Sequence, residues 1–266
     1  MRDPGLYDVP ELEYHADRET LSSTMLKHIL RAPAYLRHYL DAERVEKPEF
    51  DFGHAVHALV LGVGLGIEVV DAGSWRTKAA QTARDEAYAA GRVPMLAHEY
   101  DRAEIAADAV RNHELAGPMF AAGRPEVSAY AIDPDTGVPL RARIDWITPD
   151  GWLIDLKTTR SGEPFAFERA GRGWGYEVQA AHYLHVYELA TGTQPTGYRL
   201  VTVEVNAPHL VDVHEPPDWV EIGEAKRKLG TALYADCLAR NHWPGRPAVI
   251  NRIASPDWEL PEEEIE

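Results

Sequence analysis

The pattern of apolar and polar residues changes character in the middle of the chain. There, three short segments with a strand-like pattern follow one another, at residues 126–134, 138–149 and 151–159. The residues between them, DPDTG and TPDG, have the composition of tight turns. The period-2 alternation is clearest at Leu140, Ala142, Ile144 and Trp146, and it predicts that these side chains share one face of a sheet. We therefore expect a β-meander in the centre of the chain.

Apolar residues recur at helical spacing on both sides of this meander. A hydroxyl within residues 22–24 can cap a helix that carries Met25 and Ile29 on one face. Pro33 should break or restart that helix. Further helices are expected at residues 50–62, 75–91, 97–115, 176–192 and 219–240, with one more strand at 196–206.

The order of helices, meander, helix, strand and helix predicts an α/β fold with a central mixed sheet flanked by helices. The chain has 266 residues, and we expect a single domain at 1–258 whose first segment, residues 1–18, is irregular. The tail at 259–266 carries five carboxylate side chains and is expected to be disordered.

Composition and charge narrow the class of protein. No apolar run approaches the roughly 18 residues that span a bilayer, and the acidic N-terminus lacks the apolar core of a signal peptide. We therefore expect a cytoplasmic protein without membrane contacts. The single cysteine, Cys237, excludes an internal disulfide and a four-cysteine iron–sulfur cluster. A net charge of −16 argues against a protein that coats DNA through bulk electrostatics, but it permits a local basic groove.

The residues most indicative of chemistry lie at one end of the predicted meander. Asp145 sits in its second strand and Asp155 in its third. If these strands pair through the TPDG turn, the two carboxylates reach one point, where they suit a hard cation such as Mg²⁺ or Mn²⁺. Lys157 shares a strand face with Asp155, so it could orient or deprotonate a metal-bound water, or stabilise negative charge. Strand-end Asp and Lys residues also form surface ion pairs, so this pattern alone decides little.

The surrounding motifs place these residues in a wider pattern. In order, the chain contains SSTMLKHILRAPAYL, FGHAVHALVLG, the acid Glu126 at the start of the first meander strand, RIDWI followed by GWLIDLKTT, and YEVQAAHYLHVY. This order and spacing resembles the PD-(D/E)XK nuclease superfamily, and within it the phage RecE-type exonucleases (exodeoxyribonuclease VIII, with a RecB-like nuclease domain). The resemblance covers most of the chain and implies a restriction-endonuclease-like core.

The resemblance also implies roles for individual residues. Lys157 matches the catalytic lysine, and Gln179 with Tyr183 match a motif that supports the site and contacts the DNA backbone. The matched metal ligands are His57, Glu126, Asp145, Asp155 and the carbonyl of Leu156. His54 departs from the family, which usually has a small residue there, and this leaves open which histidine reaches the metal. His57 is favoured because it stands four residues after Gly53.

Candidate DNA contacts lie near the capped helix and on the second meander strand. Helix N-terminal amides and nearby cations bind phosphate well, so Ser23, Lys27 and Arg31 could form a pocket for a terminal phosphate. An ordinary capped helix with a solvated basic face fits the same residues equally well. Arg143 could balance the charge of the carboxylates, and Tyr176 is interpreted as a core residue.

The resemblance finally implies a function and partners. It implies a Mg²⁺- or Mn²⁺-dependent exonuclease that digests linear double-stranded DNA from 5′ to 3′, leaving 3′ single strands for recombination with a RecT-type annealing protein. It also implies a ring-shaped homo-oligomer around DNA. Two rivals stay open, a DNA endonuclease of the same fold and a non-catalytic DNA-end-binding module. The related CRISPR-adaptation nucleases usually carry a four-cysteine iron–sulfur cluster, which a single cysteine excludes.

Overall fold

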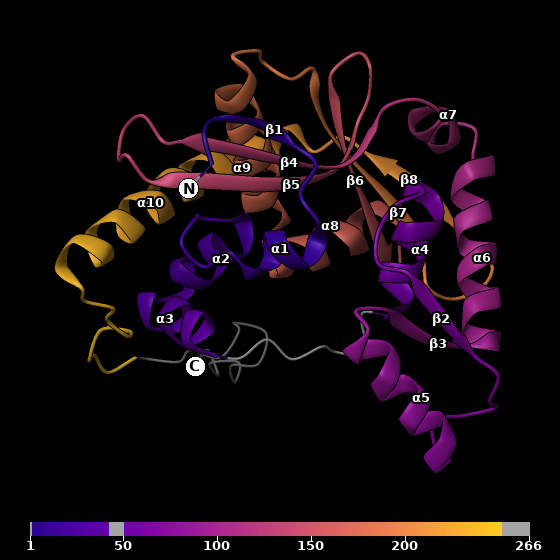
Figure 1. Cartoon of the computed structure of the whole chain (residues 1–266). Coiled ribbons are helices and arrows are strands. Elements are labelled where there is room, and N and C mark those ends of the chain that lie inside the picture. Colours follow the sequence, from indigo (N-terminus) through magenta and orange to yellow (C-terminus); the bar gives the residue numbers. More distant parts are fainter. Residues whose placement is uncertain (1, 43–50, 252–266) are drawn as a thin grey trace, which may run out of the picture.

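The computed structural model describes residues 2–42 and 51–251. At its centre, six strands form one mixed sheet with helices on both sides (Figure 1). In chain order these strands are β1 (Gly5–Tyr7), β4 (Arg124–Ile132), β5 (Pro139–Ile147), β6 (Trp152–Thr159), β7 (Gly197–Glu204) and β8 (Val211–His214). The predicted α/β fold with a central mixed sheet is therefore confirmed.

A second, two-stranded parallel sheet joins β2 (Ile67–Val70) to β3 (Val93–Leu96). The surrounding helices are α1 (Glu11–Ala16), α2 (Ser23–Arg31), α3 (Pro33–Asp41), α4 (Asp51–Leu61), α5 (Lys78–Ala89), α6 (Ala97–Asn112), α7 (Ala116–Phe120), α8 (Pro164–Trp174), α9 (Tyr176–Thr191) and α10 (Pro217–Arg240). In Figure 1, α4, α5, α6 and the small sheet gather on one side, and α2, α3 and α10 on the other. No helix within residues 2–42 or 51–251 has the length and apolarity to cross a membrane.

Local sequence signals explain where several helices begin and end. The hydroxyl of Ser22 accepts a hydrogen bond from the backbone N–H of Met25 (3.4 Å) and so caps α2, as predicted. Pro33 stands in the first turn of α3, where a missing N–H is harmless, so it restarts the helix. Gly175 (φ +67°) separates α8 from α9, and Gly192 (φ +69°) ends α9 in the left-handed conformation that glycine tolerates.

The connectivity of the central sheet brings α9 to the middle of the molecule. Its strand order is β1-β4-β5-β6-β7-β8. The strands β4, β5 and β6 are antiparallel neighbours and form the predicted meander, whereas β6 and β7 are parallel. A parallel pair needs a crossover connection, and here α8 and α9 supply it. On its way, α9 packs against β4 and β5.

Two hydrophobic clusters lie on opposite sides of the strands. On β5, Ile144 belongs to the cluster shared with α2, α9 and α10, whereas Trp146 belongs to the cluster shared with α4 and α6. The prediction that these two side chains share a face is therefore wrong. The change of face coincides with an interruption of the neighbouring strand, because Glu126 of β4, opposite Asp145, has φ +51°. The side-chain alternation thus changes face at the position of two predicted metal ligands.

Some segments differ from the prediction or lie outside the described residues. Residues 1–18, predicted to be irregular, contain α1 and also β1, which pairs antiparallel with β4. The strands β2, β3 and β8 and the helices α7 and α8 are additions to the predicted elements. Most are too short to show a period, and α8 contains two glycines that weaken its helical pattern. The predicted acidic tail at 259–266 lies outside the described residues.

Candidate active site

Three carboxylates fall in one row across the central sheet. In the β4–β5 ladder, the pairs on either side of Glu126 place it opposite Asp145. In the β5–β6 ladder, one step beyond the last pair reaches Asp145 and Asp155. The two strands separate there, and the N–H of Leu156 donates to Oδ2 of Asp145 (2.9 Å). The left-handed backbone of Glu126, strained for a non-glycine residue, lies in the same row, and strain of this kind clusters at functional sites.

A histidine from α4 completes a group of candidate metal ligands. The helix can approach β6 because Gly53 has no side chain, and a Cβ there would lie 3.1 Å from Oγ1 of Thr158. One turn later, Nε2 of His57 lies 2.6 Å from the carbonyl oxygen of Leu156, and its Nδ1 lies 3.7 Å from Oδ2 of Asp145. A carbonyl only accepts, so in the neutral ring Nε2 carries the proton and Nδ1 presents its lone pair beside Asp145.

Glu126 joins this group and raises its negative charge. Ligand atoms of His57, Glu126 and Asp145 all lie within 4.8 Å of one another, and among the described residues these form the one group of three or more that could hold a metal ion. Burial and the neighbouring Asp145 raise the pKa of Glu126 to about 7. Two half-buried carboxylates at this separation favour a cation between them.

Arg143 partly offsets this charge from the β5 side. Its Nε donates to Oε2 of Glu126, and its Nη1 donates to the carbonyl of Val9 (2.7 Å) and to Oγ of Ser128 (3.2 Å). The Arg143 side chain is 12% exposed. The structure therefore places it as a charge balancer, and its predicted DNA contact would compete with these internal hydrogen bonds.

The other half of the site is a buried ion pair on β6. Nζ of Lys157 lies 2.5 Å from Oδ2 of Asp155, a carboxylate that is 1% exposed, and Nε2 of Gln179 donates to its Oδ1 (2.6 Å). Burial raises the pKa of Asp155. Burial also disfavours the charge on Lys157, but Asp155 and Asp145 outweigh it and hold the pKa of this ammonium above its ordinary value. Both oxygens of Asp155 face Gln179 and Lys157 rather than the His57 group, so its metal role stays a prediction.

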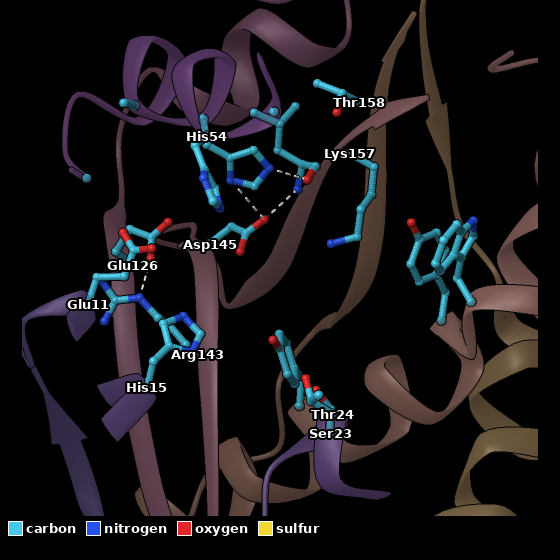
Figure 2. Close-up of a pocket in the computed structure, with 18 of the residues that line it drawn as sticks. Glu11, His15, Ser23, Thr24, His54, Glu126, Arg143, Asp145, Lys157 and Thr158 are labelled. Atoms are coloured by element: carbon cyan, nitrogen blue, oxygen red, sulfur yellow. Dashed lines mark hydrogen bonds and ion pairs between the residues drawn. The ribbon is translucent and has the colours of Figure 1, made fainter. Parts of the chain in front are cut away.

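A cavity of about 900 Å³ connects these groups. It is far larger than the roughly 30 Å³ share of one water, so it has room for a ligand group together with solvent. In Figure 2, Lys157 reaches into this space from one wall, opposite Ser23 and Thr24 at the start of α2. Asp145 lies between Lys157 and Glu126 in the same view. The metal-ligating group and the ammonium group therefore open onto one common space.

The structure brings together some predicted residues and separates others. Tyr183 lines the cavity, and burial raises the pKa of its hydroxyl well above the ordinary value. Arg31 is exposed and stacks on the ring of Tyr35 (4.2 Å to the centroid). It is not among the described residues that line the cavity. Lys27 also lies behind the wall and donates to Gln179 (3.0 Å). The DNA-contact roles remain predictions.

Several lining residues were not singled out by the sequence. Glu11 and His15 of α1 lie beside Glu126 and Arg143 in Figure 2. Their i, i+4 spacing is a helical signal that the short, irregular-looking segment concealed. Trp174, at the end of α8, lines the same cavity and is 65% exposed.

Comparisons with known proteins agree with this architecture. The chain is similar to a candidate exonuclease from Eubacterium rectale, with a TM-score of 0.58 at 13% identity over 91% of this chain and 97% of that one. An alkaline exonuclease from Laribacter hongkongensis shares 11% identity over 86% of this chain and 95% of that one, with a TM-score of only 0.36. None of the curated proteins matches the chain.

At these identities, similarity to the Eubacterium protein shows the fold alone. The comparison by family is more direct, because the family described as a PDDEXK-like domain of unknown function (DUF3799) matches residues 22–255. The resemblance to the PD-(D/E)XK superfamily is thereby confirmed, and the chain belongs to this PDDEXK-like family.

Proposed function

We propose that the chain is a metal-dependent nuclease that hydrolyses phosphodiester bonds of DNA, working from the ends of linear duplexes. One observation carries the proposal: His57, Glu126 and Asp145 form a ligand group in the same cavity as the ammonium of Lys157. Membership of a PDDEXK-like family and the likeness to a candidate exonuclease support it.

The donor set fits a divalent cation that prefers oxygen. Carboxylates of Glu126 and Asp145 would hold it, because carboxylate oxygens suit Mg²⁺ or Mn²⁺, and Nδ1 of His57 would add a nitrogen ligand. The Leu156 carbonyl, a further ligand that the resemblance implies, accepts a hydrogen bond from Nε2 of the same histidine. When bound, the ion would supply an activated water and offset charge on the leaving oxygen. Burial and the charge of Asp145 raise the pKa of Glu126, and a bound cation would offset both effects.

The chain's own residues then position the substrate. Lys157 is an ammonium donor at neutral pH, so it can hold a non-bridging phosphate oxygen and stabilise negative charge that develops there. Asp155 and Gln179 fix its location from behind. Across the cavity, Ser23 and Thr24 lie in the first turn of α2, where free backbone amides favour phosphate.

The family resemblance extends the proposal beyond this chemistry. We propose 5′-to-3′ polarity, a ring-shaped homo-oligomer and a RecT-type annealing partner. We also propose a cytoplasmic location, which would be the cytoplasm of a bacterial host if a phage encodes the protein. A ring would reconcile the net charge of −16 with DNA binding, because an acidic exterior can surround a basic channel.

Substrate topology tests this proposal against its rivals. Purified protein with Mg²⁺ should release mononucleotides from a linear duplex labelled at one 5′ end, and label should appear early. It should leave covalently closed circular DNA intact. Cutting of the circular DNA would support an endonuclease. Early release of a label at the 3′ end would indicate 3′-to-5′ digestion instead. Binding to duplex ends without any release would favour a non-catalytic module.

A further inference from the structure

A second lysine lies behind the candidate active site. Lys27 of α2 donates from Nζ to Oε1 of Gln179 on α9 (3.0 Å), although the two residues are 152 positions apart. Gln179 in turn donates from Nε2 to Oδ1 of Asp155 (2.6 Å), and Lys157 meets the other oxygen at 2.5 Å. Three elements, α2, α9 and β6, therefore contribute to one continuous polar chain.

The direction of every contact in this polar chain is forced by chemistry. An ammonium group donates and never accepts, so Oε1 of Gln179 must face Lys27. Its NH₂ group must then face Asp155, and an ionised carboxylate accepts from both Gln179 and Lys157. An ionised Asp155 requires the NH₂ end of the amide with or without Lys27, and Lys27 holds the oxygen end, so the Gln179 side chain is fixed at both ends. Loss of Lys27 would leave the oxygen end of Gln179 without this partner, and the amide could then shift away from Asp155.

The location of Lys27 separates this task from DNA contact. Ser23 and Thr24, one turn earlier on α2, line the cavity, but Lys27 is not among its described lining residues. The turn between α8 and α9 makes room for its stem, because a Cβ at Gly175 would lie 3.2 Å from Cγ of Lys27. The polar head therefore reaches Gln179 from inside the protein.

The ring of Tyr176 contacts both ammonium groups. Nζ of Lys27 and Nζ of Lys157 are each 5.4 Å from its centroid, a distance at which the electron-rich face attracts a cation. Burial and the charge of Lys157 lower the pKa of Lys27 to about 8. A partly buried lysine beside another lysine is unfavourable for folding, and its hydrogen bond to Gln179 offsets part of that cost.

We propose that Lys27 is a positioning residue, which orients Asp155 and Lys157 through Gln179 and does not itself bind a terminal phosphate. This inference rests on the proposed nuclease function. Its direct consequence concerns the catalytic step rather than substrate affinity, because a small misplacement of reacting groups is felt in the rate of chemistry.

Steady-state kinetics on linear duplexes distinguish the two roles of Lys27. We expect Lys27→Met to lower kcat by about 10- to 100-fold, with KM nearly unchanged and the same loss on 5′-phosphate and 5′-hydroxyl ends. Lys27→Arg keeps a donor and should recover part of the rate. Lys228→Met, at a 62% exposed lysine of α10, is the matched control and should behave as wild type.

A double variant tests the coupling of Lys27 to Gln179. Because Lys27 acts through Gln179, adding Lys27→Met to Gln179→Met should cause no further loss. Additive losses, wild-type rates in Lys27→Met, or a loss confined to KM on 5′-phosphate ends would each overturn the inference. If Lys27→Met does not fold, the rates of Lys27→Arg and Gln179→Met are compared with that of wild type. A fully active Gln179→Met would then overturn the positioning role of Lys27.

A readout that needs no activity keeps this inference separate from the proposed function. The side-chain amide protons of Gln179 should be protected from solvent exchange by NMR in wild type, lose this protection in Lys27→Met and keep part of it in Lys27→Arg. Absence of DNA cleavage by wild type would refute the proposed function alone. Unchanged protection in both Lys27 variants would refute the positioning role alone.

Discussion

The packing of α9 on α10 can be tested at one glycine. A Cβ at Gly223 of α10 would lie 1.9 Å from the carbonyl oxygen of Glu177 and 3.0 Å from Cβ of Ala181, both on α9. The nearer atom belongs to the backbone of a helix, so no side-chain rotation relieves the clash. One of the two helices must move, and α9 carries Gln179 of the candidate site.

The size of the effect follows from two opposing contributions. Overpacking costs up to about 3 kcal/mol, and replacing glycine by alanine inside a helix returns roughly 1 kcal/mol. We therefore expect Gly223→Ala to lower the free energy of unfolding by about 2 kcal/mol. For a chain of this size, that loss corresponds to a fall in Tm of about 4–8 °C.

Two other helical glycines serve as matched controls. A Cβ at Gly173 of α8 would meet no neighbouring atom within 4 Å, so Gly173→Ala should stabilise by up to about 1 kcal/mol. A Cβ at Gly230 of α10 would meet Cδ2 of Leu26 at 2.8 Å, the end of a flexible side chain, and Gly230→Ala should fall between the two. Urea unfolding followed by circular dichroism measures all three. A Gly223→Ala variant as stable as Gly173→Ala would refute this packing.

Three further predictions concern charge and metal. Burial and Asp145 raise the pKa of Glu126 from 4.5 to about 7. The contribution of Glu126 to folding stability is therefore fully present below pH 4.5 and is lost as the pH rises through 7. In EDTA at pH 8, the free energy of unfolding in urea should therefore be higher for Glu126→Gln than for wild type, by at most roughly 3 kcal/mol. Near pH 4 the two should be equally stable, and equal stability at pH 8 would contradict the raised pKa. Arg227, 1% exposed, pairs with buried Asp133, so Arg227→Met should cost about 3–5 kcal/mol in urea unfolding, and a loss below about 1 kcal/mol would mean that the pair is solvated. Mn²⁺ at a hundred times its Kd should stabilise wild type by about 2.7 kcal/mol in thermal unfolding, and His57→Ala should lose most of this gain; an undiminished gain would place the ion elsewhere.

Much of the fold follows from local patterns in the sequence. The turns DPDTG and TPDG, the strands that flank them and the cap at Ser22 are determined by nearby residues, and each is found as predicted. The pairing of β5 with β6 also follows, because the TPDG turn sets their register, and this brings Asp145 and Asp155 into one row. The sequence motifs also resemble the PD-(D/E)XK superfamily, and the match to a PDDEXK-like family confirms that resemblance.

Other features depend on contacts between distant segments. The change of face at Trp146 coincides with the positive φ of Glu126 on the neighbouring strand, and a period-2 rule cannot register such an interruption. The exposed Trp174 of α8 and the acidic Glu11 of α1 reach the cavity only because of tertiary packing. Likewise, the contact between Lys27 and Gln179 spans 152 positions, and no local pattern in one sequence encodes it.

The central claim is that the His57, Glu126 and Asp145 group forms a metal-dependent nuclease centre. Its most direct test is the rate of nucleotide release from a linear duplex in Mg²⁺ or Mn²⁺, with Asp145→Asn compared with wild type. The matched control is Asp135→Asn, at an exposed position of the β4–β5 turn. We expect Asp145→Asn to be at least about 100-fold slower, wild type to be inactive in EDTA, and Asp135→Asn to match wild type. Equal rates for Asp145→Asn and wild type, or full activity in EDTA, would contradict the account.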